Sequence, residues 1–153
     1  MTKWLRLRGS FRNMDTSSVK KANNNYRPIK SFRDLEVYRN TYQLMLMVLK
    51  EVLPKLPDSE KYDLRDQINR SCKAIPRLIA EGYAKRHQKA GFQKYLDDAL
   101  GECNETIVSL EQCRDIYHID EKLIDETVDI YDKSARQLYK LSKAWTQFKN
   151  RQT

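Results

Sequence analysis

The residue types that most often do chemistry are sparse in this chain, and their spacing fits no common catalytic or phosphate-binding motif. The four glycines are scattered, so neither GxGxxG nor GxxxxGK[ST] occurs, and a nucleotide-binding loop is not expected. A di-metal centre in a helical bundle needs paired Glu-x-x-His motifs, whereas only Asp115-x-x-His118 comes near that pattern, once. The sequence therefore predicts a protein without enzymatic activity, metal or cofactor.

The two histidines and three cysteines all have plain structural interpretations. His87 lies in the basic run of residues 85–89 with no nucleophile beside it, which favours a solvated loop histidine. His118 is interpreted as the C-terminal cap of a helix. The cysteines show no CxxC spacing and fall on apolar helix positions, which predicts buried, reduced thiols. They are Cys72, Cys103 and Cys113.

Positive charge is the remaining chemical signal. Residues 61–94 hold nine Lys or Arg against three acids. At 100° per residue, three of these cations fall within about 60° of one another and opposite an apolar stripe. These three, Arg70, Lys73 and Arg77, form what we call the basic ridge. It could neutralise phosphates along a nucleic-acid backbone, so RNA or DNA is the expected partner. The predicted nucleic-acid-binding residues are Arg70, Lys73, Arg77, Lys85, Arg86, Lys89 and Lys94.

An alternative interpretation of the basic ridge needs no nucleic acid. Arg70 and Arg77 would pair with acids of a neighbouring subunit in a structural oligomer. The last predicted helix offers the acids Asp125, Glu126, Asp129 and Asp132. Nearby aromatic residues do not decide between the two, because they fit core positions as well as stacking platforms. They are Tyr83, Phe92 and Tyr95.

The charge is distributed very unevenly along the chain. Residues 1–30 contain eight Lys or Arg against the single acid Asp15, a net charge of +7, whereas residues 31–153 have a net charge of +1. Residues 1–30 also lack apolar periodicity, which predicts a basic flexible arm. The 40% hydrophobic content of the whole chain is enough for one folded domain, which we assign to residues 31–150.

Two further observations bear on location. The longest apolar run, residues 44–49, is far shorter than the roughly 20 residues that cross a bilayer. The first residues have no apolar stretch or cleavage site typical of a secretory signal. A cytoplasmic protein without a membrane partner is therefore expected.

Four long helices explain the apolar pattern of residues 31–150. Glycine and proline are few, which favours long helices over many short strands. Apolar residues recur at alternating steps of three and four in four segments, the spacing of an amphipathic helix face. The first segment begins near Phe32, after the N-cap Ser31 and with Asp34 in a capping-box position, and ends at Pro54 and Pro57.

The other three helices have signals of their own. The second opens at Tyr62 or Leu64 and weakens at Gly82, and Pro76 inside it predicts a kink rather than a break. The third has an uninterrupted stripe over residues 92–117. The fourth follows the N-cap Asp120 and runs to about residue 149.

The helices and their short connections predict an all-α fold, an antiparallel up-down-up-down four-helix bundle. Apolar residues also occur off the main stripes of the first and last helices, and we interpret them as a surface that oligomerisation would bury. They are Leu46, Met47, Val48, Leu123, Ile130, Leu141 and Phe148.

Three segments together resemble a known bacterial family. They are Ser31-Phe-Arg-Asp-Leu-Glu-Val-Tyr38, Gln67-Ile-Asn-Arg-Ser-Cys-Lys-Ala-Ile-Pro-Arg-Leu-Ile-Ala-Glu-Gly82 and Phe92-Gln-Lys-Tyr-Leu-Asp-Asp-Ala-Leu-Gly-Glu-Cys-Asn-Glu105. The chain resembles the four-helix bundle family of ribosomal RNA intervening-sequence proteins. That family includes the accessory variability determinant proteins of diversity-generating retroelements. The chain departs from the common pattern at Ala74 and Leu78, where Ser and Asn are usual, so a polar role there is lost.

The resemblance implies a non-enzymatic binding module. Retroelement accessory proteins assemble as homopentamers and bind a reverse transcriptase and nucleic acid, and the strongly basic composition favours that branch. The resemblance therefore implies self-association into a pentamer, with a reverse transcriptase and RNA or DNA as partners. The alternative branch is an intervening-sequence-type structural oligomer that binds no nucleic acid.

Overall fold

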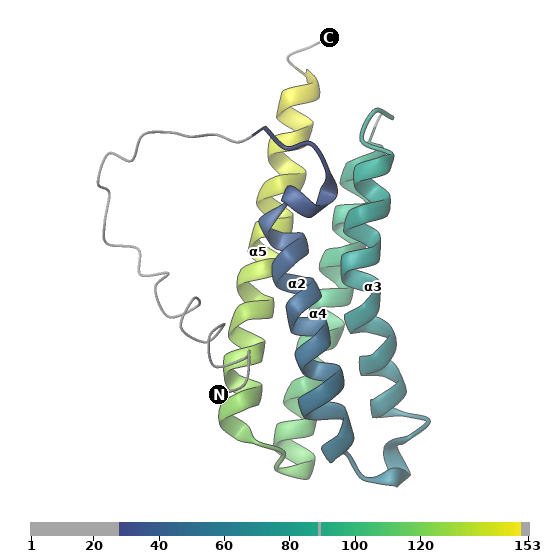
Figure 1. The fold of residues 1–153 in the computed structure, drawn as a ribbon, viewed down its shortest axis with the longest axis vertical. Helices are drawn as coiled ribbons and strands as arrows, with labels where there is room; N and C mark the ends of the chain where they lie inside the picture. Colours follow the sequence, from purple (N-terminus) through teal and green to yellow (C-terminus); the bar gives the residue numbers. More distant parts are fainter. Residues whose placement is uncertain (1–27, 89, 151–153) are drawn as a thin grey trace, which may run out of the picture.

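The computed structural model describes residues 28–88 and 90–150, the last three as backbone only. Within these residues the chain forms helices and turns and no strand. The four long helices are α2 (Glu36–Met47), α3 (Leu64–Ala84), α4 (Gly91–Tyr117) and α5 (Glu121–Asn150). They lie side by side along the longest axis, and successive connections are at opposite ends (Figure 1). The predicted all-α four-helix fold is confirmed, whereas most of the predicted arm lies outside the described residues.

The chain enters the bundle through a short turn instead of directly through a helix. Ser31 Oγ accepts a hydrogen bond from the Arg33 N–H at 3.0 Å, and the Asp34 carboxylate accepts one from the Ser31 N–H at 2.8 Å. This capping box closes the 3₁₀ turn η1 (Phe32–Asp34), after which Leu35 is extended and buried. The predicted cap is present, but α2 begins at Glu36, four residues later than the predicted start.

α2 does not keep one helical register to its end. A π-helical turn, η2 (Val48–Val52), follows it, and the short 3₁₀ turns η3 (Leu53–Lys55) and η4 (Asp58–Glu60) lead to α3. A π turn holds one extra residue and so rotates the side chains that follow it. Val48 and Val52, at the two ends of this turn, are both fully buried.

The observed packing changes the interpretation of the off-stripe apolar residues. Met47 and Val48 lie in the core of the single chain, and Leu46 is half-buried. In α5 the off-stripe residues Leu123 and Ile130 pack against the same core. The inference that these residues form a surplus apolar surface was therefore wrong in large part, because the chain buries them itself.

α3 passes through Pro76 without a break. The helix is continuous from Leu64 to Ala84, and Pro76 is buried within it. It also continues two residues beyond Gly82, so Gly82 does not mark its end. A Cβ atom at Gly82 would lie 2.5 Å from the Cβ of Tyr95 and 3.1 Å from the ring of Phe92. Gly82 thus allows α3 and α4 to approach closely.

The core runs between all four helices. α3 packs against α2 and α4, and α5 packs against α4 and α2. The predicted stripe of α4 is buried from Phe92 to Cys113, and Tyr131 of α5 is fully buried. Small polar residues join helices inside the core, as where Thr106 Oγ1 donates to Ser71 Oγ at 2.8 Å.

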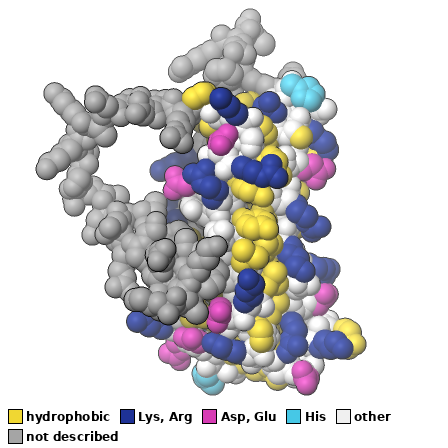
Figure 2. Space-filling model, viewed as in Figure 1, with side chains coloured by type: hydrophobic (Ala, Val, Ile, Leu, Met, Phe, Trp, Pro, Cys, Tyr) yellow, Lys and Arg dark blue, Asp and Glu magenta, His cyan; other side chains and the backbone are white. Residues whose placement is uncertain are grey.

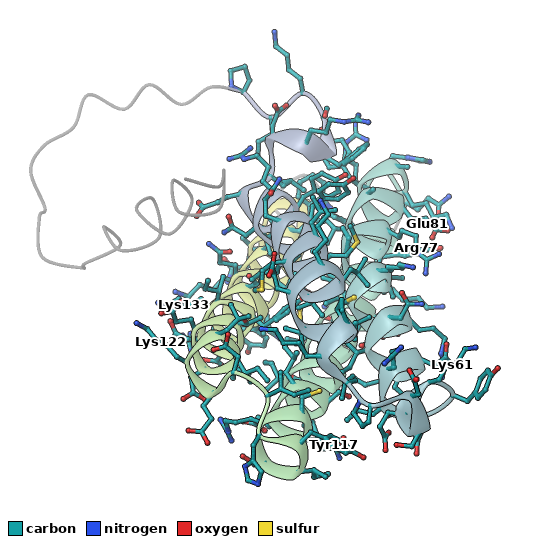
Figure 3. All side chains as sticks on the ribbon, turned by 60° about the horizontal axis from the view of Figure 1, so that its bottom comes forward. Lys61, Arg77, Glu81, Tyr117, Lys122 and Lys133 are labelled. Atoms are coloured by element: carbon teal, nitrogen blue, oxygen red, sulfur yellow. The ribbon has the colours of Figure 1, made fainter. Side chains whose placement is uncertain are left out.

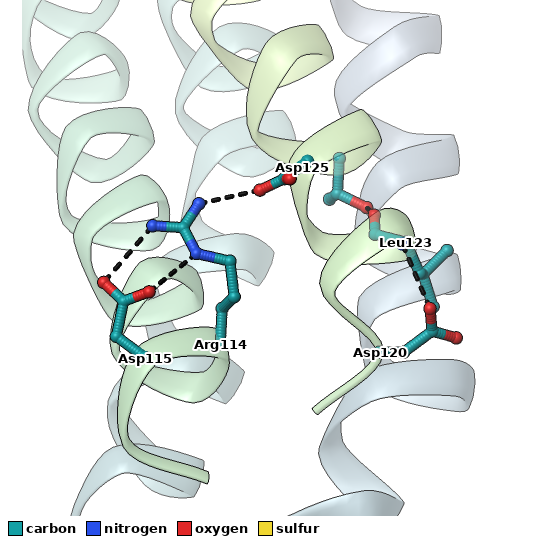
Figure 4. Close-up of polar contacts among 6 residues, drawn as sticks. Arg114, Asp115, Asp120, Leu123 and Asp125 are labelled. Atoms are coloured by element: carbon teal, nitrogen blue, oxygen red, sulfur yellow. Dashed lines mark hydrogen bonds and ion pairs between the residues drawn. The ribbon is translucent and has the colours of Figure 1, made fainter. Parts of the chain in front are cut away.

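The turn between α4 and α5 uses the two caps that the sequence predicts. His118 adopts a left-handed conformation with φ of 52° and donates its N–H to the carbonyl of Arg114 at 3.0 Å. Asp120 Oδ1 accepts the N–H of Leu123 at 3.2 Å (Figure 4). These bonds satisfy backbone groups that the ends of α4 and α5 would otherwise leave unpaired.

Arg114 ties the two helices together beside this turn. Its guanidinium contacts Asp115 on α4 and Asp125 on α5, each at 2.7 Å (Figure 4). The carboxylates hold the pKa of Arg114 above its usual range, and Arg114 lowers the pKa of Asp115. The end of the bundle at the α4–α5 turn is therefore held by ion pairs between the two helices as well as by the core.

Candidate nucleic-acid interface

The basic ridge lies on the outer face of α3. Arg70, Lys73 and Arg77 are all exposed, opposite the buried stripe of the same helix. Figure 3 shows Arg77 and Glu81 pointing away from the bundle. Arg70 pairs with Asp66 at 3.2 Å, one helical turn earlier. Lys73 and Arg77 make no ion pair with any described residue, so their charges are open to a partner.

Acids of α4 lie close enough to influence the basic ridge. Burial is the main cause that raises the pKa of Glu102, Glu105 raises it further, and Arg70 and Arg77 oppose the shift. The positive field of the ridge is thus partly offset within the chain. The ridge can contact phosphates, but it is not a surface of one charge sign.

The turn after α3 carries a second set of cations. Lys85 Nζ lies 3.3 Å from Glu81 and also donates to the Tyr95 hydroxyl, and that second bond is the largest cause raising the pKa of Lys85. Arg86 donates to the carbonyl of Tyr83 at 2.8 Å. Its guanidinium stands 4.1 Å from the centre of the Tyr83 ring. These two side chains are held in place while still half-exposed.

Lys94 and Lys89 complete the predicted set of nucleic-acid-binding residues. Lys94, in the first turn of α4, is exposed and has no ion pair in the described part of the chain. Lys89 lies outside the described residues. Of the other six predicted residues, the structure thus places three on the ridge of α3, two in the α3–α4 connection and Lys94 on α4.

The three nearby aromatic residues have different environments. Phe92 is 1% exposed and packs edge-on against Tyr83 and Trp145, with ring centres 6.0 and 5.1 Å apart. It belongs to the core, so the stacking-platform interpretation is wrong for Phe92. Tyr83 and Tyr95 are half-buried, and each contacts a cation.

The structure adds cations that the sequence pattern does not reveal. The Tyr83 hydroxyl donates to the carbonyl of Ile29 at 3.5 Å, which brings the start of the described chain against the end of α3. Lys30, Arg33 and Arg39 arrive with that segment. We call the resulting surface the basic end, made of Lys30, Arg33, Arg39, Lys85 and Arg86. Its two halves are about 50 residues apart in sequence, so no local pattern could have joined them.

The acids invoked by the alternative oligomer interpretation already have partners. Asp125 bonds Arg114. Asp129 lies 2.7 Å from Lys133, and Asp132 pairs with Arg136. Asp125, Asp129 and Asp132 are therefore engaged within the chain, which weakens the expectation that they neutralise Arg70 and Arg77 of another subunit.

The cysteines are free and buried, as the sequence predicts. Burial raises the pKa of Cys72 and of Cys103 to about 12 and that of Cys113 to about 11. In residues 28–88 and 90–150, no three His, Cys, Asp or Glu side chains are grouped as a metal ion would require. Of the helices in the same part of the chain, none combines the length and apolar composition that crossing a bilayer requires.

Comparison with known proteins agrees with the fold. A family profile described as 23S rRNA-intervening sequence protein matches residues 33–140. A crystal structure from Bacteroides thetaiotaomicron, described as a protein with unknown function from the S23 ribosomal protein family, is similar with a TM-score of 0.62 and 22% sequence identity. The similarity covers 70% of this chain and 95% of that one. No match is found among curated proteins.

Proposed function

We propose that this chain, which belongs to the family of 23S rRNA-intervening sequence proteins, is a non-enzymatic adaptor that binds RNA. The main support for the proposal is that several exposed cations lack an ion-pair partner among the described residues. Lys73, Arg77 and Lys94 are exposed without an ion pair among the described residues. Asp125, Asp129 and Asp132 of α5, in contrast, are each paired with a cation of α4 or α5.

The arrangement suits contacts to a phosphate backbone. The basic ridge extends along nearly two turns of α3, so its cations can meet successive phosphates on one strand. Binding of this kind is largely independent of base sequence and falls steeply with salt. The acids of α4 beside the ridge limit its field, which favours contacts made at short range.

The finer assignment rests on the resemblance to retroelement accessory proteins. We propose an antiparallel up-down-up-down bundle that assembles into a homopentamer and binds a reverse transcriptase together with RNA. The connections at alternating ends of the bundle support the helix order (Figure 1). The resemblance supports the pentamer and the protein partner.

Charge reversal on the basic ridge tests RNA binding. We expect Arg70→Glu, Lys73→Glu and Arg77→Glu together to weaken binding of a structured RNA hairpin by about tenfold or more at low salt, and to reduce the salt slope by about three. Fluorescence anisotropy at several salt concentrations measures both. Circular dichroism checks that the variant remains helical.

A matched control reverses three exposed lysines of α5. Lys122→Glu, Lys140→Glu and Lys143→Glu change the net charge by the same amount but lie away from α3. Their effect on RNA affinity should be clearly smaller. Equal losses in the two triple variants would show that net charge alone matters, and unchanged affinity in the ridge variant would refute the proposal.

A further inference from the structure

Three aromatic rings of η1 and α2 contact one another in sequence. Phe32 packs edge-on against Tyr38, with ring centres 4.8 Å apart, and Tyr38 stacks on Tyr42 at 6.0 Å with the ring planes 29° apart. We call these three residues the aromatic ladder. Tyr38 and Tyr42 are one turn apart on α2, and the η1 turn brings Phe32 back to meet them. Tyr42 is 40% exposed and ends the series.

The face of the bundle that carries α2 combines apolar and basic side chains. Figure 2 shows a strip of hydrophobic side chains over α2, bordered by Lys and Arg side chains over α3. Val37, Leu44 and Met47 of α2 are buried in the core, whereas Tyr42 is exposed. An exposed aromatic ring on a face that also carries cations can offer a stacking surface and charge to one ligand.

Two arginines flank the ladder, and neither forms an ion pair with another described residue. The Arg33 guanidinium stands 4.4 Å from the centre of the Phe32 ring. Arg39 Nη1 donates to the carbonyls of Arg33 and Asp34 at 3.0 and 2.8 Å. Carbonyls fix a guanidinium without neutralising it, so its remaining N–H groups can still donate to a phosphate.

The acid nearest in sequence to Arg33 is Asp34, whose carboxylate caps the η1 turn. The Asp34 carboxylate accepts the N–H groups of Lys30 and Ser31 at 2.9 and 2.8 Å, and these bonds are the main causes that lower its pKa. Asp34 stays charged and offsets one cation. The whole basic end nevertheless keeps five Lys or Arg against Asp34, Glu36 and Glu81, so it remains positive.

From this combination we propose that the aromatic ladder and the arginines beside it bind a single-stranded segment of RNA. The inference rests on the proposed function and names the form of RNA that this end of the molecule recognises. Bases of a duplex are already stacked on one another, whereas unpaired bases can stack on aromatic side chains and arginine planes. The guanidiniums of Arg33 and Arg39 then contact phosphates on either side of a stacked base.

The test compares two RNA probes and two tyrosine variants. The probes are a short fluorescein-labelled oligouridine and a blunt-ended RNA duplex made of two separate strands. Tyr42→Leu removes the exposed ring while keeping an apolar side chain on α2. Tyr62→Leu is the matched control, because Tyr62 is 85% exposed and lies in the connection between η4 and α3, far along the chain from the ladder. Circular dichroism and light scattering verify folding and particle mass.

We expect Tyr42→Leu to weaken oligouridine binding by roughly 5- to 150-fold, the range for loss of one base-stacking contact, and to leave duplex binding unchanged. Tyr62→Leu should change neither. The inference is overturned if Tyr42→Leu leaves oligouridine affinity intact, if both probes weaken equally, or if the particle mass changes, which would make the ladder a contact between copies of the chain. Duplex binding by the unaltered protein reports separately on the proposed function.

Discussion

At the scale of single residues, the buried thiols are the groups most sensitive to solution conditions. Cys72 on α3 and Cys103 on α4 are fully buried, and desolvation is the main cause that raises the pKa of each thiol to about 12. Burial likewise raises the pKa of Tyr131 well above its usual value, with both thiols adding to that shift. The interior of the bundle is therefore built to hold these groups in their neutral, protonated forms.

Stability should fall in alkali for this reason. The folded thiols keep their protons to a higher pH than the unfolded chain, whose thiol pKa is 9.0. Their contribution is complete below about pH 9 and is lost as the pH rises towards about 12. We expect the free energy of unfolding in urea to decline across this range, with the decline measured by far-ultraviolet circular dichroism.

The double variant Cys72→Ala, Cys103→Ala separates the thiols from other alkaline groups. It should be less stable at pH 7, because it creates space in the core, but should lose less stability between pH 9 and pH 11. Parallel declines in the two proteins would contradict the assignment. Iodoacetamide provides a second readout, since the native thiols should react much more slowly than the unfolded ones.

At the scale of elements, the approach of α3 to α4 depends on the absence of a side chain at Gly82. We expect Gly82→Ala to destabilise the protein by about 1 to 3 kcal/mol, because its Cβ would meet the side-chain base of Tyr95, which cannot swing away. Chemical denaturation measures the change.

Gly101 supplies the matched control in the neighbouring helix. A Cβ there meets nothing within 4 Å, and the residue lies in the interior of α4. Gly101→Ala should stabilise the protein by about 0.5 to 1 kcal/mol through helix propensity. If both substitutions had the same sign, helix propensity rather than contact between α3 and α4 would govern Gly82.

The elements also show how far sequence reasoning reaches. The stripe of α4 and the caps at His118 and Asp120 were predicted correctly, because a regular helix and its ends follow from local spacing and residue type. The π turn was not predicted, because the burial of Val48 and Val52 depends on contacts with other helices. Among the candidate site residues, the ridge was placed on an exposed face by periodicity alone, whereas the basic end required a tertiary contact through Tyr83.

At the scale of the whole molecule, the question is how many chains act together. The described residues leave several large hydrophobic side chains exposed on different helices, including Val108 and Ile116 on α4 and Tyr139 on α5. The proposed pentamer would bury side chains of this kind between copies of the chain.

We expect light scattering after size-exclusion chromatography to give a particle mass of about five times the 18.2 kDa chain mass. Structured RNA should shift the elution at low salt but not at high salt, because the contacts are ionic. A monomer that is indifferent to RNA would contradict both the assembly and the adaptor function. A pentamer that never shifts would support the structural oligomer instead.

The π turn after α2 has a consequence for how the length of this protein can change. A helix packed on neighbouring helices is disrupted by a lost residue, because a deletion rotates everything beyond it by about 100°. At Val48–Val52 the chain already carries one residue more than an α-helical path needs. Deleting Leu49 would therefore convert this segment to a plain α-helix and leave both flanks in place, so related chains one residue shorter should have their gap here.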